Sequence, residues 1–239
     1  MEDAVEFSDC LIHSGERNYI CITDVHGIVE AQSDAEFKAI LNGSAITTPD
    51  GMPLVWVGRL QGNNKIQRVY GPDYLIEICR ASAKRGYRHF FFGGRPGVAK
   101  QLAESLSRRF PGLQVVGAYT PPFRPLNASE ERELAALVTQ AKPDFFWVGI
   151  GSPKQERFMA KYCGKLDTRI MVGVGAAFDI HSGNVKEAPK WVRSAGLQWL
   201  HRLIQDPRRL WKRYLTCIPS FLWMITLQLL GIRRFNIES

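Results

Sequence analysis

The stretch PDFFWVGIGSPKQERF, residues 143–158, joins a short apolar run to a polar turn that contains two glycines. An apolar run of this length between turn residues is typical of a buried strand. Pro153 suits the first turn of a helix, where its missing N–H has no partner to lose. We therefore predict a strand over residues 145–150 and a helix over residues 153–163, which together form the strand–turn–helix unit of an α/β protein.

The same alternation extends in both directions through the 239 residues. Strands that alternate with amphipathic helices favour a parallel sheet that is covered on both faces. The predicted fold class is therefore α/β, with a Rossmann-like, mostly parallel sheet and helices on both faces. The other predicted strands are residues 19–23, 45–48, 88–92, 113–117 and 170–174, and the other predicted helices are residues 34–41, 52–60, 72–85, 96–110 and 129–140.

The chain changes character after Gly175, where strand-like runs stop and aromatic residues mix with arginines. We predict a Rossmann-like catalytic domain over residues 1–185 and a helical, membrane-associating appendage over residues 186–239. We expect Pro189 and Pro207 each to begin a helix, and Pro219 to begin the apolar terminal segment. The net charge of +8 is concentrated in the appendage, which has ten basic and three acidic side chains. This surplus indicates an anionic partner.

Residues 219–232 form an apolar segment of about 14 positions, short of the roughly 20 that span a bilayer as a helix. Because basic residues flank this segment, we expect contact with a membrane interface and no binding of nucleic acid. The N-terminus lacks the apolar core of a secretory signal, and five scattered cysteines fit reduced thiols. We expect a peripheral protein on the cytoplasmic face of the inner membrane, and a homo-oligomer is an alternative way to cover the apolar tail.

Three glycine turns follow predicted strands: Gly94 with Arg95, Gly151 with Lys154, and Gly175. The carboxyl ends of parallel strands border the ligand crevice, and a glycine turn that enters a helix offers N–H groups to phosphate. None of these turns completes a G-x-G-x-x-G motif, so each alone can also be a tight turn without a ligand. Three such turns at one edge of the sheet favour a nucleotide-binding site.

Several polar residues near these turns are candidates for chemistry. Asp50 lies between a predicted strand and helix, so it is either a helix cap or a general base for a hydroxyl. Asp73 can be structural while Arg68 is free to meet an anion. Helix capping does not account for Lys154 and Gln155, which a phosphate or sugar site would explain. With no metal-ligand spacing and no Asp-x-Asp pair, we expect no metal and no cofactor, and we expect arginines to stabilise a leaving diphosphate.

With these motifs the chain resembles the WecG/TagA/CpsF family, glycosyltransferase family 26. Six blocks follow one another in the family's order over roughly residues 19–215. They are TTPDGMPLVW (47–56), QRVYGPDYL (67–75), FFFGGRPGVA (90–99), PDFFWVGIGSPKQERF (143–158), the segment from GVGAAFDIHSG to LQWLHRL (173–203) and PRRLWKRYL (207–215).

This resemblance implies an inverting, metal-independent transferase that moves a sugar from a UDP-sugar donor to a polyprenyl-diphosphate-linked sugar. Such enzymes build exopolysaccharide, capsule or teichoic acid linkage units, with N-acetylmannosamine, its uronic acid or glucose as the donor sugar. It implies Asp50 as the base, with Arg68 and Gln155 as further catalytic residues. The expected substrate contacts are Thr23, Asp24, Thr48, Gly94, Arg95, Gly151, Lys154, Gly175, Arg202, Arg209 and Arg213. Relatives often have Asn where this chain has Asp24, and a carboxylate there would repel a pyrophosphate unless it faces the acceptor sugar.

Two other classes of protein compete with this interpretation. A nicotinamide-dependent oxidoreductase fits the alternation of strands and helices, but its glycine motif and later ribose-binding acid are absent. A non-catalytic, membrane-associated module that binds nucleotide or nucleic acid would use the basic appendage and give Asp50 and Gln155 no role.

Overall fold

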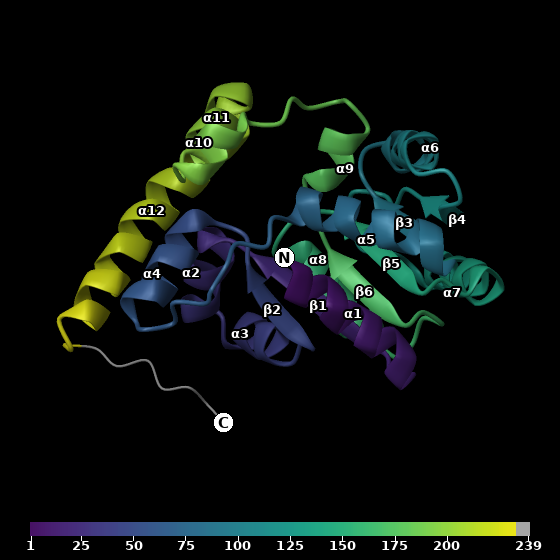
Figure 1. Ribbon diagram of the computed structural model, residues 1–239, viewed down its shortest axis with the longest axis horizontal. Helices are drawn as coiled ribbons and strands as arrows, with labels where there is room; N and C mark the ends of the chain where they lie inside the picture. Colours follow the sequence, from purple (N-terminus) through teal and green to yellow (C-terminus); the bar gives the residue numbers. More distant parts are fainter. Residues whose placement is uncertain (233–239) are drawn as a thin grey trace.

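The computed structural model describes residues 1–232 and has a six-stranded, fully parallel sheet at its centre (Figure 1). The strands follow the order β2-β1-β6-β5-β3-β4 across the sheet. This arrangement confirms the predicted α/β class with a parallel sheet. The strands are β1 (Asn18–Thr23), β2 (Ile46–Pro49), β3 (Arg88–Gly93), β4 (Gln114–Tyr119), β5 (Phe145–Gly149) and β6 (Ile170–Gly173).

Helices cover both faces of the sheet, as predicted. One face packs against α1 (Glu2–Ser14), α5 (Gly71–Arg85), α6 (Val98–Arg109) and α9 (Ala177–His181). The other packs against α2 (Val25–Ser33), α3 (Ala35–Asn42), α7 (Ala128–Ala141) and α8 (Lys154–Tyr162). The short helix α4 (Met52–Leu60) follows the edge strand β2. Neither α1 nor α2 was predicted from the sequence.

Alternate residues of each strand enter two separate cores. In β5, Phe145 and Trp147 belong to the core beneath α5, whereas Phe146 and Val148 belong to the core beneath α3 and α8. Burial on both faces explains why the strands appear in the sequence as continuous apolar runs. The buried His89 of β3 accepts a hydrogen bond of 2.9 Å from the Trp147 indole, and burial lowers the pKa of His89 to about 3.

The connections between strands define one functional edge. The chain leaves β3 toward β4 and leaves β5 in the opposite direction toward β6, although β3 and β5 are neighbours. Ligands of open parallel sheets bind outside the carboxyl ends of the strands, where such connections diverge. The ends of β1, β2, β3, β5 and β6 therefore form the edge at which a site is expected.

The appendage consists of α10 (Lys190–Ser194), α11 (Gln198–Gln205) and α12 (Pro207–Leu229). Pro189 and Pro207 lie at the starts of α10 and α12, as predicted. The prediction for Pro219 is wrong, because α12 continues through this residue. A proline inside a helix loses one backbone hydrogen bond, here the bond to the carbonyl of Leu215, a residue that is 65% exposed.

The inner face of α12 explains why the helix continues. Leu210, Cys217 and Phe221 are buried along one side of it, where it packs against α2 and lies beside α4 (Figure 1). Apolar contacts on both sides of Pro219 outweigh the single lost hydrogen bond. Among residues 1–232, no helix has the length and apolarity needed to cross a membrane.

Candidate active site

Asp50 lies directly after β2 at the functional edge. Its backbone N–H donates to the Thr23 carbonyl at the end of β1, at 2.9 Å, which fixes the position of the residue between the two strands. Helix α4 begins one residue later with Gly51 as its N-cap, and no side chain accepts from its first amides. The helix-cap alternative for Asp50 is therefore wrong. Its carboxyl group, with the side chain 26% exposed, is available for chemistry.

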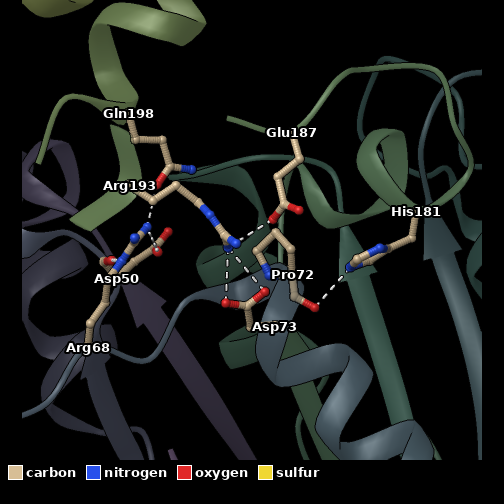
Figure 2. Close-up of polar contacts among 8 residues, drawn as sticks. All are labelled: Asp50, Arg68, Pro72, Asp73, His181, Glu187, Arg193 and Gln198. Atoms are coloured by element: carbon tan, nitrogen blue, oxygen red, sulfur yellow. Dashed lines mark hydrogen bonds and ion pairs between the residues drawn. The ribbon is translucent and has the colours of Figure 1, made fainter. Parts of the chain in front are cut away.

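Arg68 holds Asp50 from the segment that precedes α5 (Figure 2). Its Nε donates to the Asp50 carbonyl, and its Nη2 lies 3.4 Å from Asp50 Oδ1. The same Nη2 donates to Oε1 of Gln198, the first residue of α11. The Gln198 side chain of the appendage thus contacts Arg68, which in turn holds the proposed base Asp50. This contact was not predicted from the sequence, although Gln198 lies in one of the family-like blocks.

The electrostatics of Asp50 suit proton transfer. Burial raises the pKa of its carboxyl group from 3.8 to about 6, and the nearby charge of Asp24 acts in the same direction. The cationic side chains of Arg68 and Arg202 oppose this shift. A general base works best when its pKa lies near the operating pH, so a carboxylate with a pKa of about 6 is more basic than an ordinary aspartate yet ionised at neutral pH.

A second charged cluster fastens the appendage to α5. Arg193 of α10 lies 3.0 Å from both Asp73 and Glu187 (Figure 2). Its guanidinium lies 5.0 Å from the centre of the Tyr70 ring. Arg68 lies 4.4 Å from the centre of the same ring. Asp73 is thus a structural residue, as the sequence suggested, and Tyr70 lies next to both cationic side chains.

The predicted Gln155 is buried and bonded within the protein. It is 4% exposed, its Oε1 accepts from the Gly175 N–H at 3.1 Å, and its Nε2 donates to Glu156 at 3.0 Å. The Gly94 N–H similarly donates to the Gly149 carbonyl at 3.0 Å. The amides of Gly94 and Gly175 are therefore bonded within the protein rather than free to bind phosphate.

Helix N-termini supply a different source of N–H groups at this edge. Four helices, α4, α5, α6 and α8, begin here with an N-cap residue that makes no side-chain capping hydrogen bond. Such N-termini carry partial positive charge and attract anions. Asp24, in contrast, caps α2 by accepting from Gly27 at 3.1 Å. The hydroxyls of Thr23 and Thr48 are buried and have no partner in the part of the chain that the structure describes.

The structure brings only some of the predicted cations to this edge. Arg202 lies close enough to Asp50 to lower its pKa, and Arg213 donates to the Ser152 carbonyl at 3.5 Å, next to the glycine turn at Gly151. Arg209 instead pairs with Asp206 at 2.5 Å and is 69% exposed.

Two other predicted cations lie at the surface of the same edge. Arg95 is exposed and lies 3.7 Å from Asp179, and Lys154 is exposed at the first position of α8. Both remain accessible to a ligand. Within residues 1–232, no three His, Cys, Asp or Glu side chains gather as metal ligands would.

The parallel sheet, the carboxylate–guanidinium pair and the uncapped helix N-termini define a Rossmann-like enzyme site for an anionic substrate. Residues 1–235 match the model of the glycosyl transferase WecG/TagA/CpsF family, and the chain belongs to this family. The chain is similar to an N-acetylglucosaminyldiphosphoundecaprenol N-acetyl-beta-D-mannosaminyltransferase of Bacillus spizizenii, with 32% identity over 192 residues, which cover 80% of this chain and 72% of the relative. An enzyme of the same description from Bacillus subtilis is also 32% identical, over 191 residues with the same coverage.

Proposed function

We propose that this protein transfers a sugar from a UDP-sugar to a polyprenyl-diphosphate-linked sugar, with inversion at the anomeric carbon. The names of the two Bacillus relatives describe transfer to a sugar on diphosphoundecaprenol, which supports this class of acceptor. The observation that carries the proposal is the half-buried Asp50–Arg68 pair, which places a carboxylate with a raised pKa at the ligand edge of the sheet. This chemistry serves bacterial surface polysaccharide synthesis.

In this mechanism Asp50 accepts the proton of the acceptor hydroxyl as its oxygen attacks the anomeric carbon. The new C–O bond forms on the face opposite the donor diphosphate, and the bond to the diphosphate oxygen breaks, so that UDP leaves with an added negative charge. Arg68 keeps Asp50 in place by holding both its backbone carbonyl and its carboxylate. Asp24, the cap of α2, is a contact for the acceptor sugar rather than for the diphosphate in this proposal.

The charge on the leaving UDP is stabilised by protein groups in this proposal, without a metal. Arg202 and Arg213 of the appendage lie at the ligand edge, and four uncapped helix N-termini converge there. Preorganised positive charge of this kind stabilises charge that develops in a transition state. Gly94 with Arg95, Gly151 with Lys154, and Gly175 lie in three turns beside these N-termini and are proposed as donor contacts, Gly94 and Gly175 through close approach of the backbone rather than through their bonded amides, with Gln155 fixing the turn at Gly175.

The division of labour follows the proposed boundary near residue 185. Residues 1–185 supply Asp50 and Arg68, and the appendage completes the site through Gln198. Exposed apolar side chains continue along α12, including Trp211, Leu222 and Trp223. We place this surface on the cytoplasmic face of the membrane, where the acceptor lipid resides.

The test is a transfer assay with purified protein, a panel of UDP-sugars and a short-chain lipid-diphosphate N-acetylglucosamine acceptor. We expect transfer from one UDP-sugar, inversion of the anomeric configuration by NMR, and an unchanged rate in EDTA. A requirement for added Mg²⁺ or Mn²⁺ would contradict the metal-free part of the proposal. Absence of transfer, together with binding of NAD or RNA instead of UDP, would contradict the whole.

A further inference from the structure

The structure contains a cavity that the reaction described above does not use. It has a volume of about 390 Å³ and lies beside the edge strand β2, between α2, α4 and the second half of α12. Within residues 1–232, no charged residue lines it. Its apolar lining residues include Ile28 of α2, Leu54 and Val57 of α4, and Phe221, Met224 and Ile225 of α12.

One end of the cavity adjoins the proposed base. Thr48 and Pro49 line the cavity, and Asp50 is the next residue in the chain. Thr23 also lines it, and its carbonyl accepts the Asp50 N–H at 2.9 Å. One molecule can therefore place one of its parts in this cavity and a hydroxyl group of another part next to Asp50.

The opposite face of α12 points out of the molecule and is also apolar. Leu222, Trp223, Leu229 and Leu230 are all exposed, and Trp223 is 65% exposed. Large exposed apolar side chains gathered on one helix suit a membrane interface. Helix α12 thus has the apolar cavity on one side and an apolar outer surface on the other.

We propose that this cavity binds the first isoprene units of the acceptor's polyprenyl chain, an inference that rests on the function proposed above. At about 30 Å³ per water-sized group, the cavity holds roughly a dozen non-hydrogen atoms, or two to three five-carbon units. The remainder of the chain stays in the bilayer. Because no charged residue lines the cavity, the diphosphate lies outside it, toward the arginines of the ligand edge.

The test measures binding, not transfer, by titration calorimetry with diphosphates that carry one, two, three or four isoprene units. The titrations use the whole protein below the micellar concentration, without membrane or donor. We expect affinity to rise by about tenfold or more for each unit that enters the cavity, because buried CH₂ groups favour binding, and to level off after the third unit. A series with no dependence on chain length would overturn the proposal.

Two variants of α12 separate the cavity from the outer surface. Ile225→Trp fills the cavity and should remove the gain from added isoprene units while keeping the affinity for the shortest diphosphate. Trp223→Ala changes a residue two positions away on the exposed face of α12, and this variant should keep the gain in affinity from added isoprene units. Equal losses in both variants, or an unchanged series in Ile225→Trp, would show that the chains adsorb elsewhere.

Crosslinking of the unmodified protein gives a result that does not depend on the folding of a variant. A farnesyl diphosphate with a terminal diazirine should label the α4 peptide that contains Leu54, and labelling confined to α12, where the exposed Trp223 adjoins Met224, would overturn the assignment. Prenyl affinity that emerges only when residues 233–239 are removed would identify the chain's own end as the occupant. If prenyl binding depends on chain length but no transfer is seen, only the proposed function fails. If transfer is seen but binding does not depend on chain length, only this inference fails.

Discussion

Replacing Arg68 by Gln should move the acidic limb of the pH–rate profile to higher pH. In the wild type the rate of transfer should rise with pH as Asp50 ionises, with the midpoint at about 6. The Arg68 guanidinium favours the ionised form of this carboxyl group from 3.4 Å, and both side chains are largely sheltered from solvent, at 15% and 26% exposed. Removing the positive charge leaves burial and Asp24 unopposed except by Arg202, so the pKa of Asp50 must increase.

An opposite charge at such a distance generally changes a pKa by about one to three units. A shift of about two units would leave Asp50 roughly one tenth ionised at pH 7, compared with about nine tenths in the wild type. The variant should therefore lose about tenfold in kcat/KM at pH 7 and recover most of this loss by pH 9. The assay is kcat/KM from pH 5 to 10 with a soluble acceptor and a fixed UDP-sugar.

Arg193→Gln provides a matched control, because Arg193 lies over the same Tyr70 ring but is paired with Asp73 and Glu187. Its midpoint should remain at about 6. If Arg68→Gln lowers the rate equally at every pH, Arg68 contacts the substrate and does not tune Asp50. If both variants shift the midpoint equally, the effect comes from overall charge, and the local argument fails.

Three further outcomes follow from the structure. Asp50→Asn should reduce the rate of transfer by a factor of about 10²–10⁴, yet its melting temperature at pH 8 should equal or exceed that of the wild type. Because the pKa of Asp50 is raised in the folded protein, this residue stabilises the fold most below about pH 3.8 and loses this contribution as pH rises through about 6, whereas loss of a helix cap would lower the melting temperature. Removing residues 219–239 should abolish salt-sensitive binding to liposomes but keep transfer to a soluble acceptor. Removing residues 186–239 should abolish both liposome binding and transfer, because Gln198 leaves the site, and equal rates of transfer by the two shortened proteins would contradict this. Trp147→Phe should lower the free energy of unfolding in urea by about 1–3 kcal/mol, because it leaves the buried His89 without its hydrogen bond, and an unchanged midpoint would refute that role.

The sheet was predictable because burial on both faces makes each strand a continuous apolar run. The helices α1 and α2 were not predicted, for different reasons. Helix α1 carries ordinary signals, with Glu2 and Asp3 in its first turn and Gly15 at its end, in a segment interpreted only for targeting. Helix α2 is short and contains valines and a glycine, residues that favour other structures, and its cap Asp24 was assigned to a ligand.

The parts of the site were predictable, but their assembly was not. Asp50 and Arg68 each follow from local chemistry, whereas their pairing depends on a segment of irregular structure that returns to the end of β2. The contact with Gln198 depends on how α11 docks, which no local pattern encodes. Arg209 shows the converse limit, because its spacing suited a basic face but its nearest anion, Asp206, holds it at the surface.

The continuity of α12 changes how the appendage must act. If Pro219 had separated two elements, a membrane anchor and a site-completing segment could move independently. Instead one helix runs from Pro207 to Leu229, and only Asp206 separates it from α11, which begins with Gln198. A displacement of α12 therefore moves the wall of the cavity at Ile225 and the contact that holds Arg68 against Asp50 together. We therefore expect the proposed membrane contact, the proposed lipid binding and the ionisation of Asp50 to be linked through α11 and α12.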